Sequence, residues 1–194
     1  MSKSRVEAFS DGVIAILITI MVLEFHVPNG ADLAAIEPLL PVFLTYVLSF
    51  VFLGIYWNNH HHLLQAADRI NGSILWANLH LLFWLSLTPF VTGWMGRSPF
   101  VALPVAAYGV VQLFSAIAYV ILQTTIVAEH GPHSRLAMAL GRDRKGKLSL
   151  ALYTTAIPLA FVSPWTSEII YVVVALMWLV PDRRIESQLR TERR

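Results

Sequence analysis

Apolar residues are gathered into six long runs, separated by short segments that are polar or contain proline. A helix of about twenty residues spans roughly 30 Å, the thickness of a bilayer's hydrocarbon core. The pattern therefore predicts an all-α membrane protein with six transmembrane helices per subunit, in one domain over residues 1–194. The predicted helices cover residues 6–25, 39–57, 73–94, 100–128, 148–163 and 168–180, followed by a short basic tail, 181–194.

The fifth and sixth predicted helices are short for membrane spans. Pro164 and Pro181 are expected to close them, because proline cannot continue the hydrogen-bond ladder of a helix. A short span fits a bilayer by tilting little, by thinning it or by using flanking residues. A bundle of four spans with two interfacial segments stays open as an alternative.

Composition and charge support insertion in a membrane. Hydrophobic residues make up 56% of the chain, charged residues 13%, and the mean hydropathy is +0.62; globular proteins carry about 25% charged residues. If the six runs are spans, thirteen of the fourteen Lys and Arg lie on one side and only Arg97 on the other. The positive-inside rule then predicts cytoplasmic termini in a bacterial inner (plasma) membrane. The basic tail is explained by this bias, so no nucleic-acid partner is expected.

The first helix carries both polar and apolar side chains of interest. At about 100° per residue, one face carries a stripe that runs along the helix, and Ser10 and Asp11 point away from it. The residues of that stripe are Gly12, Ile16, Thr19, Ile20 and Leu23. Either the polar face docks on neighbouring helices while the stripe lines a pore, or the stripe faces lipid or is packed.

The predicted topology supplies partners for this polar face. Helix one begins on the side where helix two ends and helix three begins. Arg5, Ser10 and Asp11 are therefore expected to meet the polar end of helix two and Asn78 of helix three, in a hydrogen-bonded cluster. The candidate partners on helix two are Asn58, Asn59, His60, His61 and His62. The cluster would serve as structural glue or as part of a gate.

Several functional classes lack support. Three consecutive histidines point in different directions on a helix, so no metal site is expected. No GxSxG, HExxH or Walker loop occurs, and there is no cysteine, so the chain is not predicted to be an enzyme or to use a cofactor. No TVGYG potassium filter occurs either.

The opening of helix one, Arg5-x-x-x-Phe9-Ser10-Asp11, resembles the signature of the endolysosomal transmembrane potassium channel family in its bacterial form. Residues 57–62 and 78–90 are similar to that family as well. The resemblance implies six-helix subunits that assemble as homotetramers, with first helices lining the pore. A single FSD motif in the chain matches the bacterial form rather than the two-repeat animal form.

The resemblance also implies functions for individual positions. By offset from the motif, Ile16, Ile20 and Leu23 form a hydrophobic constriction, and Thr19 matches a hydroxyl position proposed to matter for selectivity. The implied function is a channel with a modest preference for potassium over sodium, and K⁺ is the permeant ion.

Two alternatives remain open at this point. Glu24 either concentrates cations at the outer mouth or is a solvated helix end. A secondary transporter or proton-coupled carrier would instead use Asp11 and the helix-two histidines as a relay.

Overall fold

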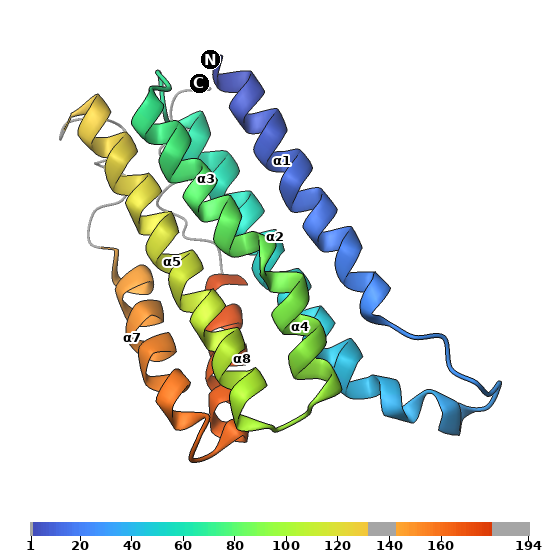
Figure 1. The fold of residues 1–194 in the computed structure, drawn as a ribbon. Coiled ribbons are helices and arrows are strands. Elements are labelled where there is room, and N and C mark those ends of the chain that lie inside the picture. The colour runs from blue at the N-terminus through green and yellow to red at the C-terminus, as the bar shows by residue number, and fades with distance from the viewer. Residues whose placement is uncertain (1, 132–142, 180–194) are drawn as a thin grey trace, which may run out of the picture.

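The computed structural model describes residues 2–131 and 143–179, and these residues form helices connected by short segments (Figure 1). The long helices are α1 (Lys3–Ile20), α2 (Leu40–Gln65), α3 (Gly72–Ser86), α4 (Thr88–Arg97), α5 (Ala102–His130), α7 (Arg144–Leu159) and α8 (Pro164–Leu179). Three short 3₁₀ turns join α1 to α2: η1 (Met21–Glu24), η2 (Leu33–Ala35) and η3 (Glu37–Leu39). α3 and α4 follow one another closely and count as one segment, so the long helices within residues 2–131 and 143–179 form six helical segments.

The helices form a bundle with α1 at one edge (Figure 1). α1 packs against α2 and α3, while α5 packs against α3, α7 and α8. In the part of the chain that the structure describes, four segments are long and apolar enough to cross a membrane, 3–24, 33–65, 72–97 and 102–130. α7 and α8 are shorter, at 16 residues each, and they lie beside only the lower part of α5 in Figure 1.

Two apolar cores hold the bundle together. One core joins α1, α2, α3 and the second half of α5 around residues such as Ile14, Leu64 and Leu81. The other joins α2, α4, the first half of α5, α7 and α8 around Tyr108 and Tyr171. α2 and α5 contribute to both cores, so they are the central elements on which the others are placed.

Hydrogen bonds connect the helix ends at the N-terminal end of the bundle. Lys3 donates from Nζ to the backbone carbonyl of Gln65 at 2.8 Å, which joins the start of α1 to the end of α2. His130, the last residue of α5, accepts at Nε2 from the backbone N–H groups of Asp68 and Arg69, at 2.9 and 3.1 Å. These bonds bring the α2–α3 connection, α1 and α5 to one level.

The observed helix boundaries differ from the predicted ranges in physically interpretable ways. α2 continues to Gln65, beyond the predicted end at residue 57. The third span is divided at Leu87, because Pro89 at the start of α4 cannot donate to the preceding turn. Pro164 begins α8 instead of closing the fifth helix, in the first helical turn where a missing N–H is tolerated. Pro181 and the tail 181–194 lie outside the described residues.

A glycine sets the distance between α2 and α4. A Cβ atom on Gly96 would lie 2.9 Å from the Cα of Val42, which is backbone and cannot move aside as a side chain would. The close approach of the two helices therefore requires glycine at this position.

We predict that Gly96→Ala lowers the thermal unfolding midpoint of the purified protein in detergent, because overpacking at a helix contact costs about 1–3 kcal/mol. Gly54→Ala is the matched control: Gly54 also lies in a helix, and among the described residues a Cβ added there would meet no side chain or neighbouring helix within 4 Å. The control should be neutral or stabilising because alanine favours helices over glycine by roughly 1 kcal/mol. Equal midpoints for the two variants would contradict the packing argument.

Candidate functional site

The two faces of α1 have opposite environments. Val6, Ser10, Ile14 and Leu17 are buried against the bundle, at the three- and four-residue spacing of one helix face. The predicted stripe is exposed: 56% of Ile16, 42% of Ile20 and 74% of Leu23 are accessible. Gly12 and Thr19 are exposed as well. α1 thus buries one side and presents an apolar surface on the other.

A buried chain of hydrogen bonds joins α1, α2 and α3. Asn78 donates from Nδ2 to the Ser10 hydroxyl at 2.9 Å, and its Oδ1 lies 2.7 Å from His60 Nε2. All three side chains are at most 2% exposed. An amide oxygen only accepts, so His60 must carry its proton on Nε2. Each of these polar groups forms a hydrogen bond with the next. Buried polar groups in an apolar bundle require such partners.

A second contact fixes the motif carboxylate. Trp57 on α2 donates its indole N–H to an Asp11 carboxylate oxygen at 3.0 Å. Its ring also stacks on His61, with centroids 6.3 Å apart. Two adjacent residues of α1 therefore hold different helices: Ser10 contacts α3, and Asp11 contacts α2.

The other predicted cluster members have different surroundings. Arg5, Phe9 and Asn58 are exposed. Asn59 contributes its backbone carbonyl, which accepts from the Tyr119 hydroxyl at 3.2 Å.

The two remaining histidines of α2 also lie outside the buried chain. His61 Nε2 lies 2.9 Å from the Gln65 side-chain amide nitrogen. His62 packs edge-on against His61, and its buried Nδ1 has no hydrogen-bond partner among the described residues. Of the five polar residues at 58–62, only His60 joins Ser10 and Asn78.

Glu24 is paired at the other end of α1. An Arg97 Nη atom lies 2.6 Å from a Glu24 carboxylate oxygen, so the end of η1 is tied to the end of α4. Gly93 permits this contact, since a Cβ there would collide with the Glu24 carboxylate. Sequence reasoning missed the pair; the signal was Arg97 itself, the lone basic residue on the side where Glu24 lies.

The Thr19 hydroxyl donates back to the Ile16 carbonyl within α1, at 2.9 Å. Its proton is therefore used, and the oxygen retains only acceptor capacity. Among the described residues, no three His, Asp or Glu side chains are grouped so as to hold a metal ion.

The fold and site define a multi-pass helical membrane protein in which a polar network orients an edge helix. The family described as "Endosomal/lysosomal potassium channel TMEM175" matches residues 5–89. A potassium channel of Chryseobacterium sp. (strain P1-3) is 53% identical over 190 residues, which cover 98% of this chain and 99% of that protein. A potassium channel of Chamaesiphon minutus is 30% identical over 89% of this chain and 91% of its own length.

Animal and structural relatives agree with these matches. Human TMEM175, described as an endosomal/lysosomal proton channel, is 31% identical over 84% of this chain but only 36% of its own length. The crystal structure of a lysosomal potassium-selective channel TMEM175 homolog from Chamaesiphon minutus superposes with a TM-score of 0.81 at 27% identity, covering 92% of this chain and 96% of that one. The chain belongs to the TMEM175 family, a family of ion channels, which confirms the resemblance seen in the sequence.

We predict that Asn78→Ala strongly lowers the thermal midpoint, because it leaves both Ser10 Oγ and His60 Nε2 buried without a partner, at about 1–3 kcal/mol for each group. Asn58→Ala, an exposed asparagine on α2, is the control and should have little effect. If both variants melt like the parent protein, the buried chain does not stabilise the bundle.

Proposed function

We propose that the chain is a cation channel with a modest preference for potassium over sodium, whose narrowest section is formed by Ile16, Ile20 and Leu23 from several copies of α1. The observation that carries the proposal is the apolar surface of α1, exposed on the side opposite its polar anchor. The names of the bacterial relatives, potassium channels, support the choice of ion.

Exposure alone does not distinguish a pore from lipid, since α8 also exposes Ile169 and Leu176. Two further features favour α1. It contains the motif that carries the family resemblance, and it lies at the edge of the bundle, where another copy has access to it (Figure 1). A pore lined by an edge helix needs other subunits, and closed symmetry, as in the proposed homotetramer, places equivalent helices around one axis.

The proposed mechanism of selection is dehydration. Isoleucine and leucine side chains narrow the path and offer an ion no oxygen ligands, so the ion sheds water with little compensation. Water binds potassium less tightly than it binds sodium, so dehydration costs potassium less free energy. An apolar constriction also closes by dewetting. Within the stripe, Thr19 is the residue whose side chain offers a cation an oxygen.

The charge distribution supports an orientation for the channel. Both termini would be cytoplasmic in a bacterial plasma membrane, with the N-terminal end of the bundle inside. Glu24 and Arg97 would then lie at the outer mouth. Arg97 lies against the Glu24 carboxylate and offsets the charge that would attract cations.

A carrier with a proton relay has less support. Asp11 is bonded to Trp57, whereas His60 is bonded to Asn78, and no hydrogen bond joins Asp11 to a histidine among the described residues.

We expect Ile16→Asn to raise potassium flux severalfold or to erode the preference for potassium over sodium, because an amide hydrates the constriction. The measurement is flux from potassium-loaded liposomes, repeated with sodium. Ile169→Asn makes the same change at a residue of similar exposure, 58% against 56%, on α8, and should leave flux and preference unchanged. An identical response of both variants would contradict the assignment of α1 to the pore lining.

At the outer mouth, Arg97→Gln should increase cation conductance at low ionic strength, because it leaves the Glu24 carboxylate uncompensated. The gain should disappear in high salt, which screens the charge. Arg97→Lys keeps the positive charge and serves as the control. A conductance gain that persists in high salt would contradict an electrostatic origin.

A further inference from the structure

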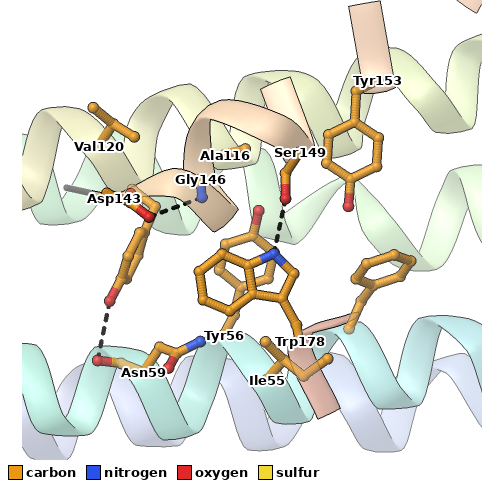
Figure 2. A pocket seen from close by; sticks show the side chains of 12 residues that line it. Ile55, Tyr56, Asn59, Ala116, Val120, Asp143, Gly146, Ser149, Tyr153 and Trp178 are labelled. Atoms are coloured by element: carbon orange, nitrogen blue, oxygen red, sulfur yellow. Dashed lines mark hydrogen bonds between the residues drawn. The ribbon is translucent and has the colours of Figure 1, made fainter. Parts of the chain in front are cut away.

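A small cavity lies between α2, α5, α7 and α8 (Figure 2), and no α1 residue lines it. Its volume is about 40 Å³. Most of the lining is apolar or aromatic, including Phe52, Ile55 and Trp178. Polar groups occur at Asn59 and at Asp143, the residue that begins α7. The cavity is therefore apolar with a polar border.

Helix lengths indicate the depth of the cavity in a bilayer, given the orientation proposed above. At the outer end, Phe100 stacks on Trp165 with ring centroids 3.6 Å apart, so α5 and α8 begin at one level. From there α7 and α8 reach inward by about 24 Å, and α5 by about 43 Å, at 1.5 Å per residue. The hydrocarbon core is about 30 Å thick. The first turn of α7 and the border of the cavity thus lie near the cytoplasmic edge of the hydrocarbon.

Positive charge is concentrated at that level. The first turn of α7 carries Arg144, Lys145 and Lys147, of which Arg144 and Lys147 are exposed. Lys145 Nζ lies 5.9 Å from the centroid of the Trp178 ring, a lining residue. The Asp143 carboxylate is engaged in capping α7, where it accepts the Gly146 N–H at 2.8 Å. Among the described residues, the two exposed cations Arg144 and Lys147 lie beside one carboxylate that is already used as a cap, and this arrangement favours an anion.

The inner wall offers hydrogen-bonding groups beside its apolar rings. Trp178 donates its indole N–H to the Ser149 hydroxyl at 2.8 Å, which fixes the ring against the cavity (Figure 2). Tyr119 donates to the Asn59 carbonyl across the border. Tryptophan and tyrosine at this depth are typical of the membrane interface.

We propose that this cavity is a binding site for one anionic phospholipid of the cytoplasmic leaflet. The phosphate lies on the basic first turn of α7, and one acyl chain lies along the opening of the cavity beside Trp178, since a cavity of about 40 Å³ has little room for more than its first methylene groups. Basic pockets between helices at the cytoplasmic side recognise anionic head groups in this way. The bound lipid joins α7 to α5 and α2. The inference rests on the membrane orientation of the proposed function, but not on ion selectivity.

The test uses the full chain in mild detergent. Phosphatidylglycerol should raise the thermal midpoint in a saturable way, and native mass spectrometry should show one retained lipid per subunit. Phosphatidylcholine of the same chain length should give a much smaller shift, as should soluble glycerol phosphate. Equal shifts for the two lipids would overturn the head-group assignment, and an equal shift for glycerol phosphate would reduce the site to one for free phosphate.

Two variants test the charged part and the apolar part of the site separately. The double change Arg144→Gln and Lys147→Gln should remove most of the phosphatidylglycerol shift; Arg69→Gln, an exposed basic residue elsewhere at the cytoplasmic end, is its control. Ala116→Leu fills the cavity and should weaken retention, whereas Ala151→Leu, an exposed position on α7, should not. Full binding by both the charge variant and the cavity variant would overturn the proposal.

Potassium flux separates this proposal from the channel hypothesis. A protein that retains one phosphatidylglycerol but conducts no potassium would contradict the channel function and leave the lipid site standing. A protein that conducts potassium but shows no preference for phosphatidylglycerol would contradict the lipid site and leave the channel function standing.

Discussion

The structure depends on satisfying three polar side chains inside an apolar bundle. Ser10, Asn78 and His60 come from three helices, and each has its hydrogen-bonding capacity used by the next. Rotating α1 by one residue would turn Ser10 away and leave the buried Asn78 amide N–H without its acceptor. The network therefore fixes the rotation of α1 about its own axis, and this rotation places Ile16, Ile20 and Leu23 on the exposed side.

Anchors at both ends leave the middle of α1 free for contact with other molecules. Lys3 bonds the end of α2 at one end, and Glu24 pairs with Arg97 at the other. Between them, apolar burial and the hydrogen bonds of Ser10 and Asp11 hold one side of the helix and leave the apolar stripe uncovered. A helix held in this way keeps its position when another molecule contacts its open face, which is what the proposed pore of edge helices requires.

The sequence predicted most of this arrangement because membrane topology restricts the options. The lengths of the apolar runs and the alternation of basic residues between the two sides predicted six spans. Helical angles placed Ser10 away from the apolar stripe. The sequence alone could not identify His60, rather than Asn58, as the residue that joins the buried network. That choice requires knowing that α2 stays helical to Gln65 and which of five consecutive residues turns inward. Pairs distant in sequence, such as Glu24 with Arg97 and Asp11 with Trp57, depend on helix packing. Pro164 begins a helix as readily as it follows one.

The unequal lengths of the helices indicate the depth of the polar network in the membrane. Asn59 on α2 and Asp143 at the start of α7 border the same cavity, so α7 begins near the level of His60 and Trp57. If that level is the cytoplasmic edge of the hydrocarbon, Asp11 lies where a carboxylate is far less costly than at the bilayer centre. The apolar stripe then begins where the hydrocarbon begins. The motif and the stripe would thus mark the boundary between a hydrated entrance and a dry constriction.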